Sequence, residues 1–181
     1  DEPGAYEIDF DQDVRAFAEA HGEIPLPPYM QRQADDSDKE RYQTVFADPN
    51  KNFAAAAPTA GLHFDPNHLA VLAEHGVEQV KVTLHVGPGT FLPVRDDDIN
   101  QHQMHAEPWH LSEAAAATLN RAKDEGRRVV SVGTTCVRVL ESATNEEGRL
   151  QTGSGLTKLF LRPGKQFAVV DALLTNFHLP K

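Results

Sequence analysis

Three short segments of the chain combine glycine with hydroxyl or imidazole side chains, which could bind and act on a small polar substrate. They are Pro58–Phe64 (PTAGLHF), Leu84–Phe91 (LHVGPGTF) and Val132–Arg138 (VGTTCVR). Glycine allows close backbone approach or a positive φ angle, threonine hydroxyls can hydrogen-bond a ligand, and imidazole titrates at about pH 6.5. One such segment is more often a turn or a helix cap, but three in one small chain favour a shared site.

The third segment follows an apolar run and opens a predicted helix. Its first N–H groups could therefore bind an anion or a carboxylate, with Thr134, Thr135 and Arg138 as candidate ligands. None of the segments contains a GxGxxG or GxxxxGK[ST] pattern, so neither a dinucleotide site nor a P-loop is indicated.

Polar side chains also interrupt or end apolar runs elsewhere. His85 interrupts an apolar strand just before a glycine loop, while Asn176 and His178 end another apolar run. Asp171 follows the run FAVV, where a carboxylate either caps a helix or acts as an acid. Each histidine could equally be a hydrogen-bonded core residue, and the sequence leaves both interpretations open.

The nine histidines do not indicate a metal site. His102 and His105 have a spacing of three but lie in a predicted loop, and no HExxH or Cys/His pattern occurs. The single cysteine, Cys136, excludes an internal disulfide framework. We expect it to be a buried small residue rather than a nucleophile.

The chain has 181 residues, with 17 basic and 27 acidic side chains and a formal net charge of −10. Charge is uneven: residues 1–120 carry 7 basic and 21 acidic side chains, whereas residues 121–181 carry 10 and 6. Either this is an ordinary solvated surface or the last third faces a polyanion. No apolar run approaches the roughly 18 residues of a membrane span, and no secretory signal opens the chain, so we expect a cytoplasmic protein.

Short apolar strands alternate with helices, which predicts an α/β fold with a mixed sheet and crossover helices. Residues 6–10 are expected to end a strand, residues 11–21 to form a helix capped by Asp11, and residues 24–32 to be extended. The other expected helices are 38–47 (capped by Asp38), 65–75, 112–125 and 134–144, and the other expected strands are 77–87, 107–111, 127–133, 156–164 and 167–174.

The chain resembles the S-adenosylmethionine:tRNA ribosyltransferase-isomerase family of queuosine biosynthesis. The matching strings occur in the family's order and cover nearly the whole chain: IPLPPYM (24–30), DKERYQTVFA (38–47), APTAGLHF (57–64), TLHVGPGTFLPV (83–94), MHAE (104–107), VVSVGTTCVRVLES (129–142), LFLRPG (159–164) and FAVVDALLTNFHLPK (167–181). The chain departs from the family's usual residues at Pro88, Cys136 and Lys158-Leu159. Cys136 stands where the family usually has serine, so a hydroxyl there is not indispensable.

The resemblance implies a central-to-C-terminal fragment of a two-domain enzyme. Residues 1–10 would be the return strand of an inserted β-barrel domain, and residues 11–181 would be part of the main α/β catalytic domain. The fragment alone is expected to be inactive, because a site shared with missing strands is not pre-organised. A monomer is favoured.

The resemblance also implies the chemistry. Such enzymes transfer and isomerise the ribosyl moiety of S-adenosylmethionine onto 7-aminomethyl-7-deazaguanine at the tRNA wobble position, giving epoxyqueuosine, adenine and methionine. S-adenosylmethionine is then a co-substrate rather than a cofactor, and no metal is required. The alternatives are an S-adenosylmethionine-dependent RNA methyltransferase and a non-catalytic tRNA-binding module.

We expect His85 or His63 to transfer protons, with Asp171 as a further catalytic candidate. Arg138 would pair with the methionine carboxylate or a tRNA phosphate, and Asp171, Asn176 and His178 would form a second wall. The expected substrate-binding residues are Thr59, Gly61, Gly87, Gly89, Thr90, Thr134, Thr135, Arg138, Asn176 and His178. The expected tRNA phosphate contacts are Arg121, Lys123, Arg127, Arg128, Arg149, Lys158, Arg162 and Lys165.

Overall fold

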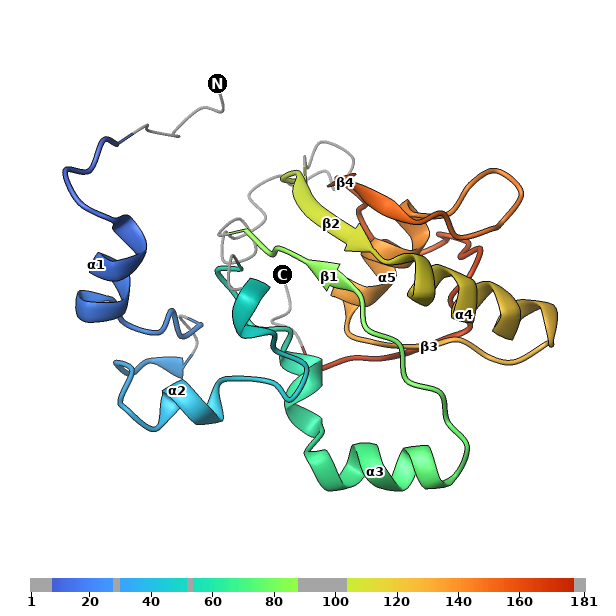
Figure 1. The fold of residues 1–181 in the computed structure, drawn as a ribbon, viewed down its shortest axis with the longest axis horizontal. Helices are drawn as coiled ribbons and strands as arrows, with labels where there is room; N and C mark the ends of the chain where they lie inside the picture. The colour runs from blue at the N-terminus through green and yellow to red at the C-terminus, as the bar shows by residue number, and fades with distance from the viewer. Residues whose placement is uncertain (1–7, 28–29, 52–53, 88–103, 178–181) are drawn as a thin grey trace.

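The structure is a computed structural model that describes residues 8–27, 30–51, 54–87 and 104–177. These residues form a mixed α/β fold in which two small sheets and helix α5 (Thr134–Ser142) lie at the centre. Helices α1 (Val14–His21) and α2 (Asp38–Arg41) lie to one side of the sheets (Figure 1). The expected α/β class is confirmed, but its strands are divided between one antiparallel and one parallel sheet rather than joined in a single mixed one.

The larger sheet has the order β1-β2-β4 and is antiparallel throughout. Strands β1 (Thr83–Leu84), β2 (Glu107–Leu111) and β4 (Gly153–Thr157) pair so that Trp109 lies between Leu84 and Gly155. Along β2 the side chains of Glu107 and Leu111 are buried, whereas those of Pro108 and His110 are exposed. One face of this sheet therefore covers the core and the other faces outward.

The smaller sheet pairs β3 (Val130–Val132) with β5 (Ala172–Leu174) in parallel. Helix α5 follows β3 directly and packs against β1, β2, β3 and β4. Parallel strands require a crossover connection, and the chain between β3 and β5 supplies it with α5 and β4. The expected crossover helix is confirmed.

The core lies between α5, α4 (Glu113–Asp124) and the two sheets. It includes Leu111, Val137 and Val169, which are almost fully buried, and Val80 and Val82 pack against its edge. Burial of this apolar surface is the main force that holds α5 against both sheets.

Helix caps explain where several helices begin. Asp65 accepts a hydrogen bond from the His68 N–H and opens α3 (Pro66–Glu74), which ends before Gly76 as expected. Ser112 opens α4 in the same way. Asp13, and not Asp11 as predicted, caps α1, because its carboxylate reaches the N–H groups of Arg15 and Ala16.

Several expected elements are shorter or displaced. Asp38 is not a cap: it lies inside the four-residue helix α2, where it binds Arg32, and Ser37 precedes the helix. Strand β1 keeps only two of the residues expected at 77–87, and β4 ends at Thr157, where a strand over 156–164 was expected to begin. Residues 8–10 lie in no strand, and the rest of the strand expected there lies outside the described residues.

The expected buried strand over 127–133 is only partly confirmed, because Val130 within β3 is 53% exposed. The division into residues 1–10 and 11–181 stays a prediction.

Candidate functional site

The structure brings the three glycine-containing segments together. The Ala55 N–H donates to the carbonyl of Val86 at 2.8 Å, which joins the approach to η3 (Thr59–His63) to the end of β1. A Cβ added at Gly133 would lie 3.7 Å from the Cβ of Ala60, so η3 also contacts the start of α5. The stretch that leads into Pro58–Phe64 thus contacts the described start of the second segment, and η3 contacts the start of the third. That they form a shared site stays a prediction.

Gly133 is required at this meeting point by its own geometry. Its φ of +90° lies in the region that favours glycine, and an added Cβ would lie 3.1 Å from the Thr135 hydroxyl. The next two residues, Thr134 and Thr135, begin α5. Their N–H groups lie at the positive end of the helix dipole, which favours a negatively charged ligand group.

Arg138, predicted to pair with the methionine carboxylate or a tRNA phosphate, is paired within the fold. Its side chain is 8% exposed and forms an ion pair with the equally buried Glu107 of β2. It also donates to the carbonyls of Leu159 at 3.1 Å and Thr157 at 3.4 Å. A guanidinium inside the fold needs such partners because an unpaired buried charge is costly. Arg138 therefore joins α5 to the larger sheet.

Glu107 is the site residue that the candidate set lacks. One of its carboxylate oxygens binds Arg138 and the other accepts a hydrogen bond from the Gly87 N–H at 3.1 Å. Glu107 thus fixes the point at which the glycine loop leaves the strand. The signal was present in the sequence: position 107 shares the buried face of β2 with Trp109 and Leu111, and a carboxylate on a buried face needs a partner.

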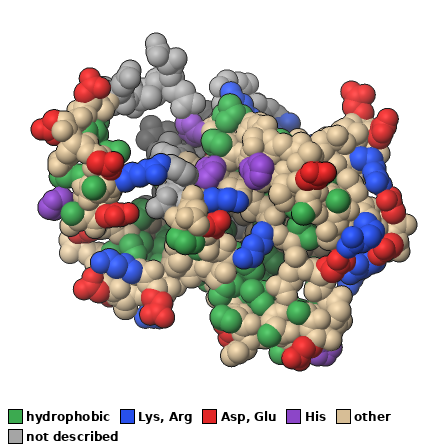
Figure 2. Space-filling view, in the orientation of Figure 1, with side chains coloured by type: hydrophobic (Ala, Val, Ile, Leu, Met, Phe, Trp, Pro, Cys, Tyr) green, Lys and Arg blue, Asp and Glu red, His purple; other side chains and the backbone are tan. Residues whose placement is uncertain are grey.

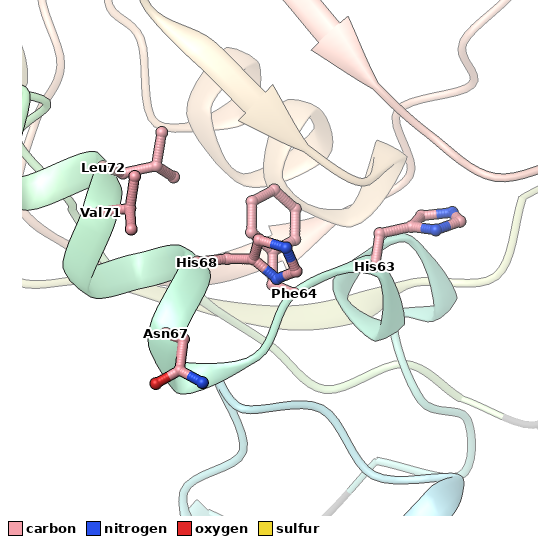
Figure 3. Close-up of a pocket in the computed structure, with 6 residues that line it drawn as sticks. All are labelled: His63, Phe64, Asn67, His68, Val71 and Leu72. Atoms are coloured by element: carbon pink, nitrogen blue, oxygen red, sulfur yellow. The ribbon is translucent and has the colours of Figure 1, made fainter.

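The two candidate proton-transfer histidines lie in different surroundings. His85 directly follows β1, its backbone N–H donates to the Pro108 carbonyl at 2.9 Å, and its ring atom Nδ1 is buried. His63 is exposed at the end of η3 and lines a pocket of about 280 Å³ with Phe64, Asn67, His68, Val71 and Leu72 (Figure 3). Figure 3 shows the His63 ring directed away from the helix that carries His68.

Asp171 lies at the wrong end of the smaller sheet for the predicted second wall. It precedes β5 and accepts hydrogen bonds from the Val129 N–H at 2.7 Å and the Lys123 ammonium at 3.0 Å. These contacts, led by the Val129 N–H, lower the pKa of Asp171. Asn176 lies beyond the other end of β5, where Gly133 bonds Leu174. The two residues are therefore separated by the length of the strand.

The remaining candidate residues differ in their surroundings. Gly61 is buried, and an added Cβ would lie 3.0 Å from side-chain atoms of both Thr44 and Phe46, so close packing explains this glycine. Thr59 is half-buried at the start of η3. Gly89, Thr90 and His178 lie outside the described residues.

Cys136 was expected to be a buried small residue, and the structure shows it half-buried. Burial raises the pKa of its thiol, which disfavours the thiolate that a nucleophile needs.

Sequence comparisons identify relatives of the whole described region. The family model described as "Queuosine biosynthesis protein" matches residues 1–181. The chain belongs to the queuosine biosynthesis protein family. Among curated relatives, the S-adenosylmethionine:tRNA ribosyltransferase-isomerases of Syntrophotalea carbinolica and Anaeromyxobacter dehalogenans are 56% and 51% identical to it, over 94% and 98% of this chain. The matches cover 49% and 52% of those relatives, so the chain spans about half their length.

A solved structure is also similar to this member of the queuosine biosynthesis family. The S-adenosylmethionine tRNA ribosyltransferase of Thermotoga maritima is 36% identical, with a TM-score of 0.49, over 67% of this chain and 37% of that one.

The resemblance to this family led us to expect tRNA contacts at eight basic residues within residues 121–181. Half of them are neutralised by acidic neighbours: Arg121 and Arg127 bind Glu78, Lys123 binds Asp171, and Arg149 binds Asp124. The Arg127 guanidinium is the main cause of the lowered pKa of Glu78. Figure 2 shows basic and acidic side chains intermixed at this end of the molecule. Arg121 and Arg127 share the single carboxylate of Glu78, so these four basic side chains lie among acidic neighbours rather than in a continuous basic patch.

The other four predicted contacts, Arg128, Lys158, Arg162 and Lys165, are exposed. Among the described residues, no group of three or more His, Cys, Asp or Glu side chains could hold a metal ion. In the same part of the chain, no helix has the length and apolar character to cross a membrane.

Proposed function

We propose that the protein transfers and isomerises the ribosyl moiety of S-adenosylmethionine onto 7-aminomethyl-7-deazaguanine in tRNA, releasing adenine and methionine. The observation that carries this proposal is the meeting of the three glycine-containing segments at one edge of the fold, in a chain of the queuosine biosynthesis family. The relatives named as S-adenosylmethionine:tRNA ribosyltransferase-isomerases support it. A tRNA substrate would place the activity in the cytoplasm.

The chemistry needs a base close to a positively charged substrate. The sulfonium of S-adenosylmethionine stabilises a carbanion on the adjoining ribose carbon, so a general base can remove a proton there. His85 is our candidate for this base, because it lies between β1 and Gly87 and its ring is partly enclosed. His63, on the exposed rim of the neighbouring segment, is the candidate proton donor for departing adenine.

The other residues of the site would orient the substrate. The hydroxyls of Thr59 and Thr134 and the N–H groups at the start of α5 would bind the sugar and the methionine carboxylate. Glu107 and Arg138 would act indirectly by holding the Gly87 backbone and α5 in place. S-adenosylmethionine would be consumed as a co-substrate.

Adenine release tests the proposal. The full-length protein is incubated with S-adenosylmethionine and tRNA carrying 7-aminomethyl-7-deazaguanine, and the small-molecule products are separated by chromatography. The proposal predicts free adenine and methionine that depend on the modified base. S-adenosylhomocysteine as the product would instead indicate a methyltransferase, and tRNA binding with no small-molecule product would indicate a non-catalytic binding module.

A further inference from the structure

The outward face of the larger sheet carries basic side chains that lie outside the last third of the chain. Val80 and Val82 pack against the core, so the alternation of an extended chain directs Lys81 and Thr83 outward. The register continues this face across the sheet, because Thr83 pairs with His110 and His110 pairs with Ser154. We call Lys51, Lys81, Thr83, His110 and Ser154 the outer sheet face.

A pocket of about 300 Å³ opens at one end of the outer sheet face. It lies between η2 (Pro49–Lys51) and the chain that leads into β1, and both Lys51 and Lys81 line it. The Lys51 ammonium donates to the Thr83 hydroxyl at 3.3 Å, which holds this lysine against the strand. Asp48 also lines the pocket, but its carboxylate accepts hydrogen bonds from the backbone and side-chain N–H groups of Asn50.

Two lysines and one aspartate line this pocket, so its lining carries a net positive charge. Neither the Lys51 nor the Lys81 ammonium forms an ion pair within the described residues, in contrast to Arg121, Arg127 and Arg149. His110 is exposed and bonds the Ser154 hydroxyl at 2.9 Å through Nδ1. Figure 2 shows basic (blue) and histidine (purple) side chains near one another over the region of β1 and β2. Ammonium, imidazole and hydroxyl groups in this arrangement suit phosphate oxygens.

We propose that the outer sheet face binds the phosphate backbone of the tRNA substrate, with Lys51 and Lys81 as its principal contacts. This inference rests on the proposed function for the identity of the RNA. Lys81 and His85 are four residues apart on an extended segment, a span of about 13 Å. A strand of RNA lying along this segment would have its phosphates at the lysines and its next nucleotides beside His85 and the glycine loop.

Salt dependence of tRNA binding tests the inference in the full-length protein. Each phosphate contact adds about 0.7–0.9 to the slope of log K against log salt concentration. We expect the double variant Lys51→Ala/Lys81→Ala to reduce that slope by about 1.4–1.8, since two contacts are removed. Its KM for tRNA should rise several-fold, while kcat and the KM for S-adenosylmethionine stay at wild-type values. Lys51→Arg/Lys81→Arg keeps both charges and should retain most of the slope.

Two comparisons make the result decisive. Lys39→Ala removes an exposed lysine of α2 that pairs with Asp36, and it should leave the slope unchanged. An unchanged slope in Lys51→Ala/Lys81→Ala, or a loss in Lys165→Ala alone, would overturn the proposed surface. The adenine assay distinguishes the two proposals. If the wild type releases adenine and the lysine variants bind tRNA normally, only the proposed tRNA-binding surface is contradicted. If the protein binds tRNA but releases no adenine, only the proposed function is contradicted.

Discussion

Glu107 and Arg138 link the candidate site to the core through two buried side chains. Glu107 holds the Gly87 N–H on one side and Arg138 on the other, so the glycine loop and α5 share one ion pair. Following the family resemblance, Arg138 was predicted to pair with the methionine carboxylate or a tRNA phosphate. The anion it meets is Glu107, which lies 31 residues away in sequence. The sequence around Glu107 does not predict this ion pair, and neither does the sequence around Arg138.

Removing the arginine should therefore destabilise the fold. We expect Arg138→Met to lower the free energy of unfolding by about 3–5 kcal/mol, because Glu107 is left as an uncompensated buried charge. The double variant Arg138→Met/Glu107→Gln should recover a large part of that loss, since glutamine keeps an acceptor for the Gly87 N–H without the charge. Urea unfolding of both variants measures this. A double variant as unstable as the single one would show that the charge is not the cause.

His85 and His63 should differ in the step that each supports. Loss of a general acid or base typically lowers the rate about 10²–10⁴-fold. We expect His85→Ala to lower kcat for adenine release by that order while S-adenosylmethionine still binds in calorimetry. His63→Ala should give a smaller loss in kcat, because its exposed ring can be replaced in part by water. Near-normal turnover in both variants would refute the assignment of proton transfer.

At the scale of elements, strong local signals predicted the structure well. Asp65-Pro66 and Ser112-Glu113 open helices as expected, and β2 has the expected bounds. Elements decided by tertiary contacts were predicted poorly. Val80 and Val82 pack on the core without pairing as a strand, whereas Val77 is exposed. Asp38 binds Arg32 inside α2 instead of capping a helix. The glycine segments could be found from the sequence, but their contacts with one another could not.

Gly133 should matter for more than stability. Gly133→Ala places a side chain at a φ of +90°, which costs about 1–2 kcal/mol, and also sets its Cβ against the Thr135 hydroxyl. We expect lower stability together with weaker S-adenosylmethionine binding. Gly76→Ala is the matched control: its φ of +76° carries a similar backbone cost, but no atom lies within 4 Å and α3 ends there. Equal effects of both variants on ligand binding would contradict the role of Gly133 in the site.

Asp38 should make stability depend on acid pH. Its hydrogen bonds with Arg32, at 2.6 Å to each carboxylate oxygen, are the main cause of a pKa lowered to about 2 from the usual 3.8. Because the folded state favours the ionised carboxylate, the stabilisation is present above about pH 4 and is lost as pH falls toward 2.

Urea midpoints measured from pH 6 to pH 2 should therefore fall less steeply in Asp38→Asn than in the wild type. Asp36→Asn, at a side chain that is 99% exposed, should keep the wild-type steepness. If Asp38→Asn showed the wild-type dependence of stability on pH, Asp38 would not be a source of that dependence.

At the scale of the whole molecule, the uneven charge has a different meaning from the one its sum suggests. Half of the predicted basic contacts of the last third pair with acidic residues, with Glu78 from outside that range and Asp124 and Asp171 from within it. Lys51 and Lys81 come from the acidic first part of the chain. Net charge by sequence range could not predict this, because phosphate binding depends on which charges remain uncompensated on one face. Lys81 of the outer sheet face and Gly87 of the glycine loop lie on either side of β1. The proposed phosphate contacts and the proposed catalytic site are therefore neighbours along the chain.

The fate of labelled S-adenosylmethionine tests the central claim most directly. The full-length protein is given modified tRNA and S-adenosylmethionine labelled separately in the ribose and in the methyl group. Ribosyl transfer predicts that ribose label enters tRNA in equal amount to the adenine released and that methyl label leaves with methionine. Methyl label in the tRNA, with the ribose label recovered in S-adenosylhomocysteine, would contradict it.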